Sequence, residues 1–329
     1  MILARRAAGV AASTGLGLFL VWLLFSFLPV SPGEAVVAAL SAPPWLYAVV
    51  TCLTLANLVV GALKWQVAAD HLAQPVRRTG FLRRVELTSL GEFFGQLIPV
   101  QLSTLLVRWV LLDREVRASG YVARATIFEQ AFDLILVLSG SVAAIAVIGF
   151  DLAAGPAVAT MAAMVAASLV ALRACLRGGE RLLRALDRRG VRAGGFAAAA
   201  DGFAHAAAAP AAVLATLSLY SLLRLVLVAL RAGAVLAVLA PSTAIWLVFV
   251  ASPPIALLTS LPIAPAGLGM AEWSWSAVLV HGGTAASVAA VAALGVRLTN
   301  MVALCVIVGG LTLLRRIGTR RADARGSGA

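Results

Sequence analysis

Eight ionisable side chains lie within, or at the edges of, long apolar stretches of the sequence. Placing one ionised group in the middle of a bilayer costs at least about 2.5 to 3.5 kcal/mol. Each of these side chains should therefore face an oppositely charged partner or a water-filled cavity, and we take them as the candidates for function. They are Glu86, Glu92, Glu129, Asp133, Arg224, Arg231, Glu272 and Arg297.

The spacing of these residues puts several of them on shared helix faces. Glu129 and Asp133 are at i and i+4, and Arg224 and Arg231 are seven residues apart, so each pair projects from one side of its helix. Two neighbouring carboxylates need either cations nearby or raised pKa values. Pairing with an arginine at the edge of the span, such as Arg124, is the simpler interpretation of both acids. Likewise, Arg231 could snorkel to the outer interface, and Arg224 could serve only as a structural partner of one acid.

No motif in the chain supports bond-making chemistry. The sequence contains no Gly-x-Ser-x-Gly elbow, Walker loop, GxGxxG or HExxH motif. The three cysteines are far apart and lack metal-ligand spacing. His71, His205 and His281 are interpreted as side chains near the membrane edges. We therefore expect no catalytic residue, no metal and no cofactor.

The composition excludes a water-soluble fold. Of the 329 residues, 62% are hydrophobic and 12% charged, whereas soluble domains carry about 25% charged residues, and the mean hydropathy is +1.00. At about 20 residues per crossing, the chain has no room for a separate soluble catalytic domain. The net charge is +12, but the arginines cluster beside apolar stretches, where they orient the chain and meet anionic lipid head groups. We expect no nucleic-acid partner.

The loops between the apolar stretches are either rich in arginine or free of it. Loops 30–44, 150–156, 238–243 and 282–284 carry no Lys or Arg. Short cytoplasmic loops carry the excess of Lys and Arg, so the basic clusters are expected in the cytoplasm together with both termini. The candidate apolar segments are about 7–29, 45–66, 86–112, 124–149, 156–175, 208–237, 244–281 and 285–314.

Two of these segments, 86–112 and 244–281, hold glycines and prolines at a density that lipid-facing backbone does not tolerate. A single crossing by 86–112 would put its flanking basic clusters on opposite sides of the membrane, against the positive-inside rule. We therefore predict two re-entrant helical hairpins that enter from opposite leaflets. Glu92, between Gly91 and Gly95, either belongs to a site or only caps a broken helix end.

The predicted fold is an all-α polytopic membrane protein with about six spanning helices, two opposed re-entrant hairpins and cytoplasmic termini. Residues 1–314 form one membrane domain, whose first stretch is too long for a signal-peptide h-region. Residues 173–204 are interpreted as a basic cytoplasmic loop with an amphipathic helix on the inner leaflet, with a solvated linker as the alternative. Residues 315–329 are predicted to form a disordered basic tail.

Four motifs, in order from about residue 60 to residue 300, match the pattern of a known family. They are the Lys64-Trp65 ending of the second segment, the Phe94 to Pro99 stretch followed by Arg108, the Glu129 to Asp133 element, and the Pro-x-x-Pro-x-Gly-Leu-Gly-x-x-Glu stretch from Pro262 to Glu272 followed by Arg297. With these motifs the chain resembles the transmembrane region of the lysylphosphatidylglycerol synthases, a flippase-like family that also occurs as stand-alone membrane proteins.

The chain lacks several charges of that family pattern. At the corresponding positions it has Ser103-Thr104-Leu105, Gln130 and Ala271. If the missing charges handle a head group in relatives, this chain takes a different or less polar substrate, or its pocket is organised around Glu92, Arg108 and Arg224.

The resemblance implies a protein that moves a lipid or a lipid-linked head group between the leaflets of the inner (plasma) membrane, without enzyme activity. The implied partner is a phospholipid, a polyprenyl-linked lipid or a hopanoid-type lipid. One alternative is an accessory subunit of a lipid-modifying or glycosyltransferase pathway, with a membrane enzyme partner or a homo-oligomer. Another is an intramembrane lipid transferase, for which the sequence offers no donor-binding domain or catalytic motif.

The stretch from Pro262 to Glu272 is the candidate head-group site. Gly267 and Gly269 allow positive φ angles and close backbone approach, so amides freed at the start of the next helix could bind a phosphate. Alternatively, the glycines only permit tight packing. The residues expected to line the lipid site are Glu92, Pro99, Arg108, Glu129, Asp133, Arg224, Gly267, Gly269, Glu272 and Arg297.

Overall fold

The regular secondary structure is helical throughout the part of the chain that the structure describes, with no strand. The all-α polytopic fold predicted from the sequence is thus confirmed. The computed structural model describes residues 15, 18–24, 26, 31–72, 79–96, 98, 100–112, 121–188, 196–260 and 267–326.

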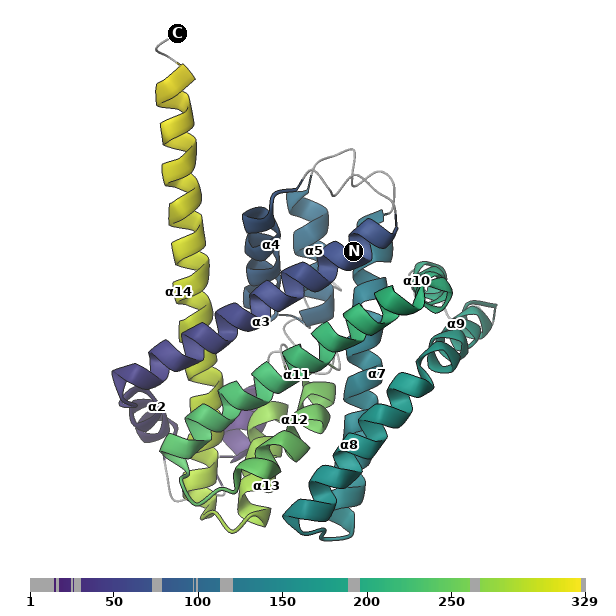
Figure 1. Cartoon of the computed structure of the whole chain (residues 1–329). Coiled ribbons are helices and arrows are strands. Elements are labelled where there is room, and N and C mark those ends of the chain that lie inside the picture. Colours follow the sequence, from purple (N-terminus) through teal and green to yellow (C-terminus); the bar gives the residue numbers. More distant parts are fainter. Residues whose placement is uncertain are drawn as a thin grey trace.

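Among the described residues, four helices are long and apolar enough to cross a membrane. Helices α3 (Pro44–His71), α7 (Tyr121–Gly149) and α11 (Ala211–Leu239) have 28 or 29 residues, and α14 (Ala286–Gly326) has 41. A 28-residue helix is about 42 Å long, whereas the hydrocarbon core is about 30 Å thick, so these helices would cross with a tilt. Helices α3 and α11 pack along each other and run obliquely past α14 (Figure 1).

Both broken segments form pairs of short helices. The first consists of α4 (Phe81–Phe94) and α5 (Val100–Leu111), and the second of α12 (Ile245–Ser260) and α13 (Met270–His281). The two helices of each pair pack against each other, with α4 and α5 in the upper half of Figure 1 and α12 and α13 in the lower half. Their insertion into the membrane from opposite leaflets stays a prediction.

The second broken segment departs from expectation at its prolines. Pro253 and Pro254 were expected to interrupt the segment, but α12 continues through both. Membrane helices tolerate proline where neighbouring helices and hydroxyl groups shield the freed backbone. The two prolines lack an N–H, so the carbonyls of Phe249 and Val250 lose their helical partners. Here α7 packs tightly on Pro253 at Gly140 and covers this part of α12.

The fifth predicted segment, 156–175, is shorter than expected. It appears as α8 (Ala154–Val170), a 17-residue helix that continues into α9 (Leu172–Arg188) after a bend of 68°. If this bent pair counts as one crossing, the described residues hold up to five, compared with six predicted for the whole chain. The first predicted crossing, 7–29, lies mostly outside the described residues, although 18–24 are helical.

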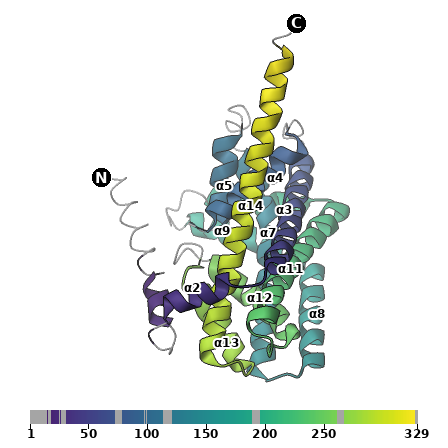
Figure 2. The same cartoon turned by 90° about the vertical axis from the view of Figure 1, so that its left-hand side faces the viewer.

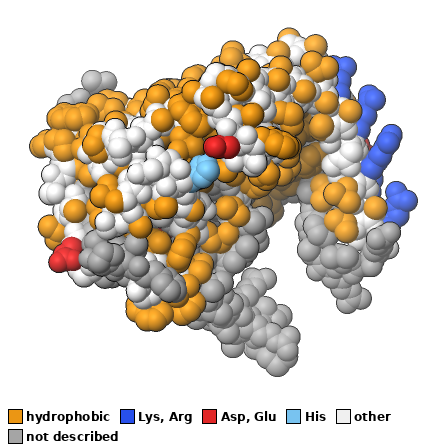
Figure 3. Space-filling model, turned by 90° about the horizontal axis from the view of Figure 1, so that it is seen from below, with side chains coloured by type: hydrophobic (Ala, Val, Ile, Leu, Met, Phe, Trp, Pro, Cys, Tyr) orange, Lys and Arg blue, Asp and Glu red, His pale blue; other side chains and the backbone are white. Residues whose placement is uncertain are grey.

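Helix α9 is amphipathic, as predicted for the basic loop. Leu172 and Leu176 are buried, and α9 packs so closely on α10 (Phe196–Ala208) that a Cβ added at Gly179 would lie 2.6 Å from the Phe203 ring. Basic side chains line the edge of the molecule over α9 in Figure 3. Its position on the inner leaflet stays a prediction. The exposed arginines, spaced three or four residues apart along one face, are Arg173, Arg177, Arg181, Arg184 and Arg188.

The C-terminal tail differs from the predicted disorder. Helix α14 continues as helix to Gly326 and extends beyond the other helices (Figure 2). Residues 315–326 contain no proline, and five of these twelve residues are arginine, a strong helix former. Because they continue an existing helix, no new nucleus is needed.

The connections that lack Lys and Arg gather at one end of the molecule. Residues 150–153, 240–244 and 282–285, which follow α7, α11 and α13, lie at the lower end in Figure 1. The beginning of α4 and the C-terminal end of α14 lie at the upper end. This arrangement matches the sidedness that the arginine clusters predict.

We expect cysteines introduced singly at Ala153 and Ser242 to react with a membrane-impermeant maleimide added to intact cells. Cysteines at Gly80 and Ala118 should react only after permeabilisation, because the basic clusters hold their loops in the cytoplasm. The three native cysteines are first replaced by serine. Outside labelling at Ala118 would show that 86–112 crosses the membrane once.

The close packing of α7 on α12 gives a second test. A Cβ added at Gly140 would lie 2.7 Å from the Pro253 Cβ, whereas one added at Gly309 of α14 would meet nothing within 4 Å. Gly140→Val should force α7 and α12 apart and cost about 1 to 3 kcal/mol. Its melting temperature in detergent should therefore fall below that of Gly309→Val. Equal melting temperatures would contradict the close approach.

Candidate functional site

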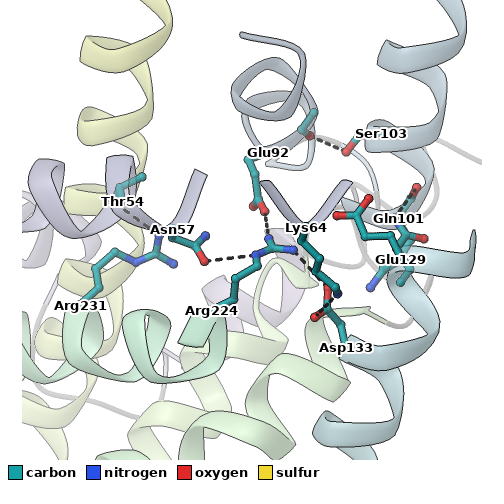
Figure 4. Close-up of polar contacts among 12 residues, drawn as sticks. Thr54, Asn57, Lys64, Glu92, Gln101, Ser103, Glu129, Asp133, Arg224 and Arg231 are labelled. Carbon is teal, nitrogen blue, oxygen red and sulfur yellow. Dashed lines mark hydrogen bonds and ion pairs between the residues drawn. The ribbon is translucent and has the colours of Figure 1, made fainter. Parts of the chain in front are cut away.

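One arginine of α11 contacts side chains from three other helices (Figure 4). The guanidinium of Arg224 donates from Nη2 to Glu92 Oε1 on α4 at 2.7 Å and from Nη1 to Asp133 Oδ2 on α7 at 3.1 Å. Its Nε lies 3.3 Å from Asn57 Oδ1 on α3. Charge-assisted hydrogen bonds of this kind are stronger than neutral ones. Arg224 therefore ties α3, α4, α7 and α11 together.

The face of α3 that meets this arginine carries a second cation. Asn57, Gly61 and Lys64 share one face of the helix. The Lys64 side chain is fully buried, and its Nζ lies 2.7 Å from Asp133 Oδ1. A Cβ added at Gly61 would lie 3.6 Å from the Arg224 Cζ, so the glycine leaves room for the guanidinium. Asp133 is thus held between two cations.

We call Glu92, Asp133 and Arg224, with Lys64 behind them, the central cluster. Arg224 is 13 residues from the start of α11 and 15 from its end, at the middle of a long apolar helix. The side chains of Arg224, Glu92 and Asp133 keep 19%, 23% and 29% of their surface exposed, whereas Lys64 keeps none. The paired charges of Arg224, Glu92 and Asp133 are therefore partly exposed, next to the midpoint of α11.

A neighbouring ion pair is almost fully buried, and we call it the closed pair. Arg108 of α5 donates from Nη1 to Glu129 Oε2 of α7 at 2.6 Å, with side-chain exposures of only 1% and 4%. The same nitrogen contacts the Thr126 hydroxyl at 3.2 Å, and the guanidinium lies 4.2 Å above the Trp65 ring, a cation–π contact. Glu129 and Asp133 share one face of α7, as predicted, but Glu129 joins the closed pair.

The position of Glu92 decides between its two interpretations. It lies in the last turn of α4, where the helix carries a partial negative charge that a carboxylate does not stabilise. Its Oε1 is bound to Arg224. In the structure, Glu92 therefore belongs to the central cluster and does not cap a helix.

Polar residues without charge join α4 to α5 where the family pattern has charges. The Ser103 hydroxyl donates to the Gly91 carbonyl at 2.6 Å. A Cβ added at Gly91 would lie 3.0 Å from the Thr104 Cα. Serine and threonine here bring the two helices into close contact.

The corner between α12 and α13 holds a third charged pair. Gly267 and Gly269 have φ of +63° and +81°, and a Cβ added at Gly267 would lie 2.7 Å from the Thr259 Cα. The Glu272 carboxylate accepts the Gly269 N–H at 2.8 Å and pairs with Arg297 of α14. Glu272 is 1% exposed. The glycines thus meet both a backbone and a packing requirement, and a head-group role for this corner stays a prediction.

The structure therefore divides the predicted site residues into three groups. Glu92, Asp133 and Arg224 form the central cluster, and Arg108 and Glu129 form the closed pair beside it. Glu272 and Arg297 meet at the corner that contains Gly267 and Gly269. Pro99 lies outside the described residues, as do Pro262 and Pro265.

Two members of the site were absent from the predicted set. Lys64 was noted only as part of a motif, and Asn57 was not considered. Their spacing of seven residues on one face of α3, in an otherwise apolar helix, is the signal that could have found them. Within the described ranges, no group of three or more His, Cys, Asp or Glu side chains could hold a metal ion.

Long apolar helices, short broken helix pairs and ion pairs within the bundle define a polytopic α-helical membrane protein. The family described as Lysylphosphatidylglycerol synthase TM region matches residues 7–309, and the chain belongs to this family. No curated protein and no solved structure gives a significant match to the chain.

We expect Glu129→Gln to destabilise the protein, because it leaves the buried Arg108 guanidinium without its carboxylate. Breaking a buried pair from one side costs about 3 to 5 kcal/mol, so the melting temperature in detergent should fall clearly. Arg108→Met combined with Glu129→Leu should recover much of the loss, since it removes both charges.

The control variant is Glu180→Gln, which breaks the more exposed pair with Arg184 on α9. An exposed pair contributes at most about 1 kcal/mol, so this variant should melt close to the unmodified protein. A Glu129→Gln variant as stable as Glu180→Gln would rule out the closed pair as a stabilising contact.

Proposed function

We propose that this protein moves a lipid, or a lipid-linked head group, between the leaflets of the inner (plasma) membrane without making or breaking a covalent bond. The supporting observation is the central cluster: paired charges at the midpoint of α11 that keep about a fifth or more of their side-chain surface exposed. Charges inside a membrane domain that are not sealed typically mark a substrate pathway.

The chemistry of the central cluster suits a polar head group. A head group crossing the apolar interior needs hydrogen-bond donors, acceptors and charges along its way, while its acyl chains stay in lipid. Arg224 offers donors, and Glu92 and Asp133 offer acceptors. These groups are already paired with each other. A zwitterionic or charged head group can therefore replace one partner of a pair at a time, so that no charge is left without a partner.

The arrangement of the broken helices supports the same proposal. Interrupted helices in the two halves of a chain are typical of transporters that bind substrate near the membrane midplane. Helices α4 and α5 come from the first half of this chain, and α12 and α13 from the second. Glu92, at the end of α4, contributes directly to the central cluster.

The family name supports a lipid partner, since it refers to a phospholipid. A phospholipid, a polyprenyl-linked lipid and a hopanoid-type lipid are all compatible with a charged cluster flanked by apolar helices. A membrane enzyme partner or a homo-oligomer belongs to the accessory alternative.

The test is lipid translocation in vesicles that contain the purified protein. A fluorescent phospholipid is quenched from outside, and the rate at which inner-leaflet lipid becomes accessible is measured. Glu92→Gln removes one charge-assisted bond to Arg224, worth about 1.5 to 3 kcal/mol. The rate per folded protein should therefore fall about ten-fold or more.

Glu180→Gln is again the matched control, because it neutralises a glutamate in an arginine pair on the surface. Its translocation rate should equal that of the unmodified protein. Glu92→Gln is expected to melt at a lower temperature, so the rates are compared per folded protein at a temperature where both variants are folded. If the unmodified protein moves no lipid faster than empty vesicles do, translocation is refuted and the accessory role gains support.

A further inference from the structure

A second arginine of α11 has no carboxylate partner in the part of the chain that the structure describes. Arg231 lies two helical turns beyond Arg224 on the same face. Its Nη1 donates a long hydrogen bond, 3.5 Å, to the Thr54 hydroxyl of α3. Within the described ranges Arg231 forms no ion pair, although its side chain is only partly exposed.

Arg231 does not reach for the outer interface. It lies eight residues before the end of α11, about 12 Å along the axis, and side chains on a helix lean toward its N-terminus. In Figure 4 the side chain points toward Asn57 and Arg224, into the region of the central cluster. This orientation argues against the snorkelling interpretation.

The charges around the central cluster do not balance. The cations are Lys64, Arg108, Arg224 and Arg231, and the carboxylates are Glu92, Glu129 and Asp133. Three of the four cations are matched by these three carboxylates, so one positive charge remains, and it falls on Arg231. An uncompensated charge inside a membrane is costly, and an anionic ligand would remove that cost.

We infer that Arg231 binds the phosphate group of an anionic lipid. A guanidinium presents paired N–H donors that match phosphate oxygens, and the buried Thr54 hydroxyl accepts one N–H and so orients the guanidinium. The Thr54 hydroxyl lies next to this guanidinium, and the Arg224 side chain lies on the same face two turns away. The inference rests on the proposed function for the lipid source of the phosphate.

Binding to the full chain in an uncharged detergent tests this inference. The probe is dihexanoyl phosphatidylglycerol, compared with dihexanoylglycerol, which lacks the phosphate, and with inorganic phosphate. Ligand binding stabilises the folded protein by RT ln(1 + [L]/Kd), so the rise of the melting temperature with ligand concentration gives the Kd. The variants are Arg231→Gln and Arg231→Lys, with Arg177→Gln on the exposed face of α9 as control.

Only the phosphate-bearing lipid should stabilise the unmodified protein. Arg231→Gln should raise its Kd about ten-fold or more, the expected loss for a charge-assisted contact. Arg231→Lys should give an intermediate Kd, because lysine keeps the positive charge but lacks the paired N–H donors of the guanidinium. Arg177→Gln should leave the Kd unchanged. Without lipid, Arg231→Gln should melt no lower than the unmodified protein, since no ion pair is lost.

An unchanged Kd in Arg231→Gln would overturn the inference. So would stabilisation by inorganic phosphate without stabilisation by the lipid. If lipid binds through Arg231 but is not moved in vesicles, the phosphate site stands and translocation fails. If Arg231→Gln binds and moves lipid like the unmodified protein while Glu92→Gln does not move it, translocation stands and the phosphate site fails.

Discussion

The arrangement of the helices depends on how Arg224 is neutralised. A guanidinium stays charged at any relevant pH, so in an apolar bundle it is costly unless carboxylates meet it. The two that meet it, Glu92 and Asp133, lie 132 and 91 residues away in the sequence. Asn57 lies 167 residues away. Neutralising this one side chain therefore requires α3, α4, α7 and α11 to meet at one point, which apolar packing alone would not specify.

Two kinds of ion pair then follow in the same bundle. Arg108 with Glu129 and Arg297 with Glu272 are almost fully closed, and each joins a short helix of a broken pair to a long neighbouring helix. The central cluster keeps part of its surface exposed. The side chains of a fully buried pair can bind a ligand only if the helices around them move apart. The partly exposed side chains of the central cluster can bind one without such a movement. The protein thus separates the charges that hold the broken helices in place from those that can meet a ligand.

The sequence predicted the elements better than their partners. Long apolar runs identified the spanning helices, and the cost of buried charge selected Glu92, Asp133 and Arg224. Helical spacing assigns a residue to a face but not to a partner, so Glu129 and Asp133, one turn apart, belong to different pairs. The helix through Pro253 also escaped prediction, because the shielding of its backbone comes from α7, which is distant in the sequence.

Uncharged residues at positions that depart from the family pattern bear on the excess positive charge around the central cluster. At two positions where the resemblance implied charges, Ser103 donates to a backbone carbonyl of α4, and the Gln130 amide lies 3.5 Å from the carbonyl of Gln101. These side chains use their hydrogen bonds on neighbouring backbone and add no carboxylate to the bundle. The carboxylates that remain are fewer than the cations around them, so this membrane interior favours a ligand with negative charge over one with positive charge.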